Sequence, residues 1–271
     1  MSNPETIARI RQLAADCGVD CDTTVWIPDF DDPAGAETLN RVWGPPLAVT
    51  RESWPRYADL ESLIGESDRP EGWDPSDLRM EHVFTIDLAG VTGIGAPEGA
   101  RAVMLFVSNS SYHEGWQPGT AHTDVVFLDA DAVARGLCRE PLPLRERERD
   151  EKRFVLVPVR VPAGVFAAAS DDAQLGALRE AIWKLPARLG GDPIWLQGDE
   201  DEEYGDDDYG DDESGDDDES GDDESAEAAP IAGRLSGYGY FMQFDESFAD
   251  VNLGDCGVMY VCGHAAWFQC Y

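Results

Sequence analysis

The chain has 271 residues, 42% of them apolar and including 8 Trp, 10 Phe and 8 Tyr, which excludes a wholly disordered chain and allows one large domain or two small ones. Its formal net charge of −35 disfavours binding to nucleic acids and to anionic membranes, and favours a basic protein partner or simple solubility. Neither a signal peptide nor an apolar stretch of about 20 residues, as a membrane span needs, is recognisable, so we expect a cytoplasmic protein with reduced cysteines.

The first predicted element is an amphipathic helix over residues 4–17. Asn3 is suited to cap it, Pro4 to occupy its first position, and Gly18 to end it. The next stretch, residues 22–80, is dense in Pro, Gly and Asp and is predicted to be loop-rich. We expect its four tryptophans to pack on the domain; they are Trp26, Trp43, Trp54 and Trp73.

Runs of β-branched and aromatic residues predict most of the strands. Residues 102–108 are apolar at both alternating sets of positions, which predicts a strand in a sheet that is covered on both faces. The mixed charges of residues 139–153 indicate a solvated loop or an exposed helix end in preference to a binding patch. A second amphipathic helix is predicted to end before Pro186. The predicted strands are 82–88, 102–108, 123–129, 154–161, 239–245, 257–262 and 266–271.

An acidic run separates the second helix from the last strands. Residues 199–227 hold 19 acids and no Lys or Arg, in an imperfect repeat of about five residues. Such a run cannot bury apolar surface, so we expect residues 199–229 to be a disordered acidic insertion in a single domain spanning 1–271. Three roles for the run stay open: binding a basic client, keeping the protein soluble, and loose binding of cations.

Two parts of the sequence match in order. Each part has a glycine-proline turn, then a strand that ends in Asp, then a strand that opens after Gly. In the first part these are Trp43-Gly-Pro-Pro, Asp87 and Gly99, and in the second they are Gly190-Gly-Asp-Pro, Asp245 and Gly254. Each Asp is suited to cap the loop that leaves its strand. The expected fold is therefore α+β, a β-rich single domain with two pseudo-repeated β-units and a few flanking helices.

Three motifs in the second part resemble the YwqG-like family of bacterial proteins: Leu189-Gly-Gly-Asp-Pro-Ile-Trp-Leu-Gln197, Tyr240-Phe-Met-Gln-Phe-Asp245 and Leu253-Gly-Asp-Cys-Gly-Val-Met-Tyr-Val261. The resemblance covers residues 40–271, although the first unit opens with Trp43-Gly44 where the family tends to have Gly-Gly. The family is distantly similar to programmed cell death protein 2, whose relatives act as dedicated chaperones of a ribosomal protein. Some of those relatives carry a zinc finger where this chain carries the acidic run, which has no Cys or His.

The candidate partner-binding residues surround the second motif. Gly190, Gly191, Pro193 and Trp195 could form a lip that binds a peptide, or they could simply make a tight turn on which the tryptophan packs. Gln197 and Gln243 could bind the backbone of a partner, or satisfy each other and nearby loop amides.

Asp245 and Asp255 flank one loop, and paired carboxylates can carry acid–base chemistry. No His or Lys lies beside them in sequence, so we assign no catalytic residue, and both are candidate partner-binding residues. Cys256, Cys262, His264 and Cys270 cluster near the C-terminus without a known zinc spacing, so buried thiols are favoured over a metal site and no cofactor is expected.

Our first hypothesis is a non-enzymatic protein-binding module, chaperone-like, for a basic client. The alternative is an immunity protein that neutralises a cognate bacterial toxin, because acidic surfaces suit basic toxin nucleases. An RNA-processing enzyme is disfavoured by the acidic surface and by the lack of a catalytic motif.

Overall fold

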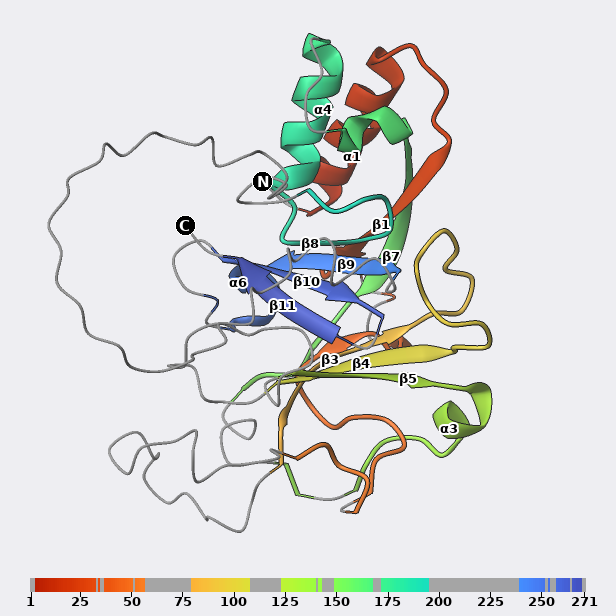
Figure 1. Ribbon diagram of the computed structural model, residues 1–271, viewed down its shortest axis with the longest axis vertical. Coiled ribbons are helices and arrows are strands. Elements are labelled where there is room, and N and C mark those ends of the chain that lie inside the picture. Colours follow the sequence, from red (N-terminus) through yellow and green to blue (C-terminus); the bar gives the residue numbers. More distant parts are fainter. Residues whose placement is uncertain are drawn as a thin grey trace, which may run out of the picture.

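The computed structural model describes residues 3–32, 34, 37–50, 52–56, 79–107, 123–139, 141–142, 149–167, 172–194, 239–251, 253, 257–263 and 265–269. These residues form one β-rich α+β domain in which two antiparallel sheets stack face to face (Figure 1). The described part of the six-stranded sheet has the order β11 (Ala265–Gln269), β10 (Val258–Cys262), β9 (Tyr240–Asp245), β8 (Ala187–Leu189), β1 (Thr23–Asp29) and β7 (Val155–Val161). The described part of the five-stranded sheet has the order β5 (Thr123–Leu128), β4 (Ala102–Val107), β3 (Glu81–Asp87), β2 (Arg41–Val42) and β6 (Lys152–Arg153).

The two predicted β-units are confirmed by the pairing of the strands. Strands β2 to β5 and strands β8 to β11 each form a four-stranded antiparallel meander, one in each sheet. In the first unit Arg41 lies opposite Thr85, and in the second Arg188 lies opposite Gln243. Strands β6 and β1 occupy the equivalent place beside β2 and β8.

Both units also carry a β-bulge at the same position. The register of β3 against β4 shifts around Val83, and the register of β9 against β10 shifts around Phe241. A bulge inserts one unpaired residue and bends the strand, so its recurrence at a matched position is specific evidence of a repeated unit.

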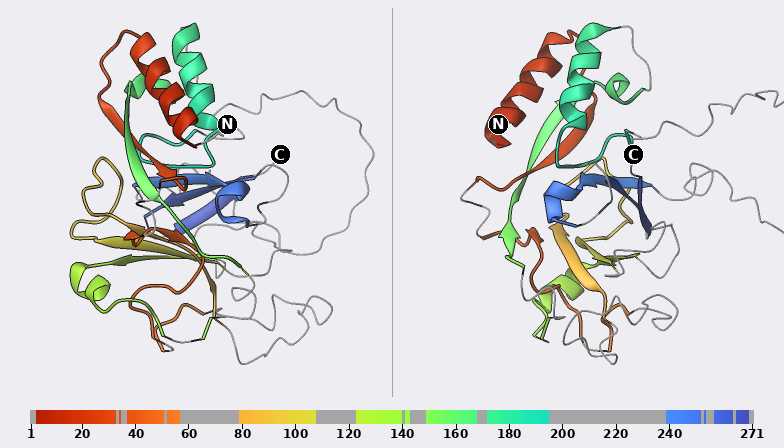
Figure 2. Two further views of the ribbon diagram at one scale, coloured as in Figure 1. Left: turned by 180° about the vertical axis from the view of Figure 1, so that it is seen from behind. Right: turned by 90° about the vertical axis from the view of Figure 1, so that its left-hand side faces the viewer.

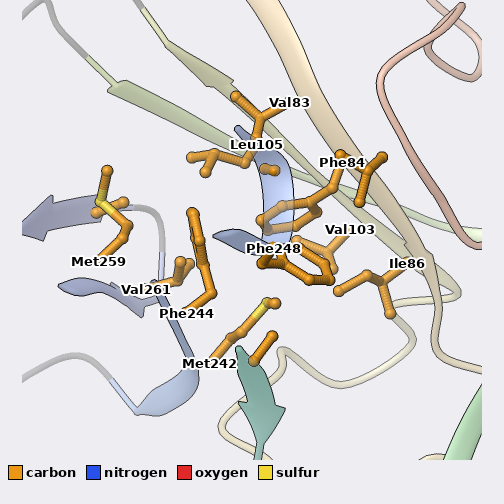
Figure 3. Packing of buried hydrophobic residues seen from close by; sticks show 14 of the residues in the cluster. Val83, Phe84, Ile86, Val103, Leu105, Met242, Phe244, Phe248, Met259 and Val261 are labelled. Carbon is orange, nitrogen blue, oxygen red and sulfur yellow. The ribbon is translucent and has the colours of Figure 1, made fainter. Parts of the chain in front are cut away.

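The main core lies between the two sheets (Figure 3). Val103 and Leu105 of β4 face Met242 and Phe244 of β9, and the rings of Phe84 and Phe244 meet edge to face at 5.8 Å between centroids. Alternation of side chains along each strand sends one set of apolar residues into this core.

The opposite face of β4 is covered as well, as the sequence predicts. Met104 and Phe106 pack beneath Leu47 and Trp54, together with residues of α3 (Ala130–Ala134). Strand β4 is therefore buried along its whole length, since the inner and outer apolar sets each have their own cover.

The sheets are joined at both sides of the stack. At one side the Thr123 hydroxyl of β5 donates to the carbonyl of Ala266 in β11, at 3.0 Å. At the other side the chain passes directly from β6 in one sheet to β7 in the other.

Two helices, α1 (Asn3–Asp16) and α4 (Ala173–Trp183), lie side by side at one end of the molecule on β1 and β7 (Figures 1 and 2). They form a second core with η4 (Ala163–Phe166), in which Ile10, Leu178 and Ile182 meet Val159. Both predicted helices are confirmed, although α1 begins at Asn3, the residue expected to cap it. A short helix, α6 (Glu246–Ala249), follows β9.

The prediction of a loop-rich stretch over 22–80 is wrong for the strands β1 and β2. Strand β1 contains Pro28, which cannot donate to a ladder, and it is stabilised by pairing with β7, far away in the chain. The expected packing of tryptophans is confirmed for Trp43 and Trp54, which are buried, while Trp26 is half-buried and donates to the Thr92 carbonyl at 3.0 Å.

Several predictions lie outside the described residues, namely Trp73, the end of the last predicted strand beyond residue 269 and the acidic insertion. Within the described part, no helix is both long and apolar enough to cross a membrane.

Candidate functional site: a glycine turn held by a buried arginine

The second unit carries the turn 190–194, which follows β8. Gly190 and Gly191 both have left-handed φ angles, +75° and +71°. A Cβ at position 190 would lie 2.9 Å from the Thr24 carbonyl oxygen, and one at position 191 would overlap the ring of Phe166. Both glycines are therefore required by backbone conformation and by close packing, as the structural interpretation of this motif expects.

Arg188 lies beneath the turn and is fully buried. Its guanidinium donates to the carbonyl oxygens of Gly190 (2.7 Å) and Asp192 (2.6 Å) and to the Gln243 side-chain oxygen (3.0 Å). It also lies over the rings of Phe166 and Tyr240, 5.0 and 5.4 Å from their centroids. Burial lowers the pKa of Arg188, and the oxygens and ring faces around it compensate for the lost hydration of its charge.

Gln243 and Tyr260 complete the support, and we call the three residues Arg188, Gln243 and Tyr260 the arginine clamp. The Gln243 oxygen accepts a second hydrogen bond, from the Ile194 N–H at 3.1 Å, and the Tyr260 hydroxyl donates to the Ile194 carbonyl at 3.0 Å. The three residues lie directly opposite one another on neighbouring strands, so the sheet itself fixes their spacing. Ile194 is thereby held at both of its backbone polar groups.

The point at which the chain returns to the sheet is also held. The Gly95 N–H donates to the Tyr240 carbonyl at 3.0 Å, and the Gly263 N–H donates to the Gly239 carbonyl at 3.1 Å. A Cβ on Gly95 would lie 2.7 Å from the Cα of Gly239, so the two backbones are in close contact. Residues 195–238, which contain the acidic run, are therefore attached at two hydrogen-bonded points beside neighbouring strands.

The first unit has an equivalent turn with a different support. Trp43 and Gly44 have φ angles of +62° and +79°, and the carbonyl of Gly44 contacts Nδ1 of the buried His82 at 2.9 Å. Nε2 of His82 contacts the Thr85 hydroxyl at 2.9 Å. His82 and Thr85 stand where the second unit has Tyr240 and Gln243, and burial lowers the pKa of His82 to about 4.

Asp245 lies away from the turn. Gly190 bonds to Phe241, and Asp245 is four residues further along β9, which corresponds to about 13 Å. Its Oδ1 caps α6, accepting from the Ser247 N–H at 2.9 Å and the Ser247 hydroxyl at 2.6 Å, while burial raises its pKa. Asp87 accepts from the Ala89 N–H at 2.8 Å in the same way, so the predicted capping role of both aspartates is confirmed.

The structure therefore separates the predicted site residues. Gly190, Gly191 and Pro193 form the turn with Gln243 beneath it, and the side-chain oxygen of Gln243 already accepts hydrogen bonds from Arg188 and Ile194. Trp195, Gln197 and Asp255 lie outside the described residues. The sequence analysis did not identify Arg188. The available signal was that Arg188 is the one charged residue in the short segment 187–189, which directly precedes Gly190 and Gly191.

The late thiol cluster is described only in part. Cys262 is buried, and burial raises its pKa to about 12, while Cys256, His264 and Cys270 lie outside the described residues. Where the structure describes the chain, no group of three or more His, Cys, Asp or Glu is arranged to hold a metal ion.

Comparison with protein-family models, with curated proteins and with solved structures finds no match to this chain.

Proposed function

We propose that this protein is a non-enzymatic binding protein of the YwqG-like family that holds a basic client through its acidic residues 199–227. One observation carries the proposal: 19 acids without a single base are inserted between two neighbouring strands, and both points of insertion are held by hydrogen bonds. A client bound by this segment is kept next to the folded domain.

The charge distribution supports a basic client. The residues outside 199–227 carry a net charge of −16, so the folded body attracts the same class of protein as the acidic run. Electrostatic complementarity of this kind speeds association and suppresses partners of the wrong sign. Because the screening length falls from about 10 Å at 0.1 M salt to about 3 Å at 1 M, binding should weaken steeply as salt is added.

The contacts of the described candidate residues do not suggest catalysis. Asp245 is engaged as a helix cap, and Gln243 holds the turn. His82 has both ring nitrogens in contact with protein oxygens. Each of these polar groups has a structural partner that accounts for it.

The proposal is tested by changing charge without changing length. In one variant every Asp in 199–227 becomes Asn and every Glu becomes Gln; in the control the same residues are kept in scrambled order. Binding of purified basic ribosomal proteins is measured by calorimetry in low and high salt. We expect the neutral variant to lose binding and the scrambled control to keep it. Equal binding by all three proteins would refute the role of the acidic run.

A second candidate is an immunity protein, and the acidity of the folded body favours it. In that case the whole acidic surface would cover a basic toxin. If a toxin is encoded beside this gene, cells that express the toxin should grow again when this protein is expressed with it. The variant with neutral residues 199–227 should still protect the cells from the toxin. Loss of protection in that variant would favour the client-binding proposal instead.

A further inference from the structure

A furrow of about 520 Å³ runs between α1 and α4, and no residue of the turn 190–194 lines it. Its two walls are matched: each helix contributes side chains at spacings of three, four and seven residues, which place them on one face. The main lining residues are Thr6, Ile10 and Leu13 of α1 and Ala177 and Ala181 of α4, with Pro186 beyond the end of α4. Thr6 and Leu13 are seven positions apart, which corresponds to about 10 Å along the helix.

The furrow is aliphatic along its length and cationic at its rim. Ala177 and Ala181 are short, so they leave space above Ile10, which forms part of the buried core. Lys184 at the rim bonds to Glu180 at 2.5 Å. Arg9, also at the rim, is exposed, and among the described residues none is joined to its side chain by a hydrogen bond or ion pair. With Arg9 and Lys184 against Glu180, the charged residues that line the furrow carry a net charge of +1, on a chain whose net charge is −35.

We propose that this furrow binds a medium-chain fatty acid, with the aliphatic chain between α1 and α4 and the carboxylate on Arg9. A volume of this size is within the range of about 300–1,000 Å³ that is typical of small-molecule sites. Apolar walls with a net charge of +1 at the rim match an apolar chain with a single anionic group. A carboxylate on a guanidinium forms charge-assisted hydrogen bonds, which are stronger than neutral ones.

Charge distinguishes this ligand from other occupants of a groove between helices. A basic amphipathic helix would bring positive charge to Arg9. An acidic helix or an anionic membrane would bring many negative charges to a strongly acidic protein. A fatty acid brings one negative charge, and the rest of its free energy of binding comes from burial of its chain.

The test is calorimetric titration of the full chain with sodium dodecanoate, below the concentration at which it forms micelles. We expect saturable binding of one molecule, and about fourfold tighter binding for each methylene added from hexanoate to octanoate, because burying a methylene contributes about 0.8 kcal/mol. Longer chains should gain less for each methylene, because the furrow is only about 10 Å long. Arg9→Gln should weaken binding about tenfold, as expected for loss of a charge-assisted hydrogen bond of roughly 1.4 kcal/mol. Ala177→Phe, which fills the furrow, should abolish binding.

Matched controls keep the test decisive if a variant is unstable. Ala15→Phe places the same side chain at another exposed position of a helix, and Arg135→Gln removes an exposed charge elsewhere; neither should change binding. Circular dichroism checks that each variant is folded. Equal loss of binding in Ala177→Phe and Ala15→Phe would overturn the proposal. So would equal binding of dodecyltrimethylammonium, or binding to phosphatidylglycerol vesicles in place of free dodecanoate.

Discussion

Replacing Gly191 by alanine tests whether the turn 190–194 is as rigid as its contacts imply. Gly191 has a φ of +71°, and a Cβ there would overlap the ring of Phe166, with Cε2 at 2.7 Å and the tip of the ring closer still. Ordinary Cβ contacts begin at 3.4 Å, so the ring would have to withdraw. It has little room, because Phe166 is only 7% exposed and lies 5.0 Å beneath the Arg188 guanidinium.

The expected cost has two parts. A left-handed backbone costs a non-glycine residue about 1 kcal/mol, and an overpacked side chain in a filled site costs about 1–3 kcal/mol. Gly191→Ala should therefore lower the free energy of unfolding by about 2–4 kcal/mol. Gly90→Ala is the matched control, because Gly90 has a φ of +74° and no neighbouring atom lies within 4 Å of the place a methyl group would take. Only the backbone cost of about 1 kcal/mol then applies.

Urea unfolding followed by tryptophan fluorescence measures both variants. An unchanged slope against urea would show that the native and unfolded states keep their relative compactness, so the shift in midpoint reports stability. Adding Phe166→Leu to Gly191→Ala should recover part of the loss, because the shorter side chain leaves space for the methyl group. Equal destabilisation by Gly191→Ala and Gly90→Ala would refute the reasoning, and the turn could no longer be treated as a fixed anchor for the acidic segment.

Three further predictions concern buried polar groups. Arg188→Lys removes the planar donors that reach the turn, so we expect a loss of about 3 kcal/mol in urea unfolding; an unchanged midpoint would contradict the arginine clamp. Burial lowers the pKa of His82 from 6.5 to about 4, so the unfolded chain binds the proton of this histidine more tightly than the folded chain does. The stability that neutral His82 contributes is therefore complete above pH 6.5 and falls by about 3 kcal/mol as the pH drops to 4. In thermal melts over this range, the stability of His82→Gln should depend less steeply on pH than that of the unchanged protein. Asp245→Ala should cost about 1 kcal/mol in chemical unfolding through loss of the cap on α6, and Asp245→Asn should retain most of the stability; equal loss in both would argue against a capping role.

Periodicity in the sequence was sufficient for the larger elements. The helical spacing of apolar residues located α1 and α4, and the two apolar sets of residues 102–108 predicted that β4 is covered on both faces. The ordered repeat of glycine turns and aspartate-ended strands predicted two β-units, which the matched registers and bulges confirm. These features could be predicted because each depends on neighbours close in the chain.

The short strands could not be predicted in the same way. Strands β2, β6 and β8 have two or three residues, too few to show any alternation, and they are stabilised by partners far away in the chain. The role predicted for Gln243 depended equally on distant residues, since its oxygen meets Arg188 and the Ile194 N–H only once β8 lies beside β9.

Composition and local spacing were enough to establish the class of fold, the repeat and the separation of an acidic run from an apolar body, because they decide what can be buried. Other features arise only when distant strands and helices pack together. They are the burial of Arg188, its hydrogen bonds to the glycine turn, and the furrow between α1 and α4 with Arg9 at its rim. The physical reason is that a buried charge needs hydrogen-bond acceptors and ring faces from several strands at once. No single stretch of the chain determines how those strands are arranged.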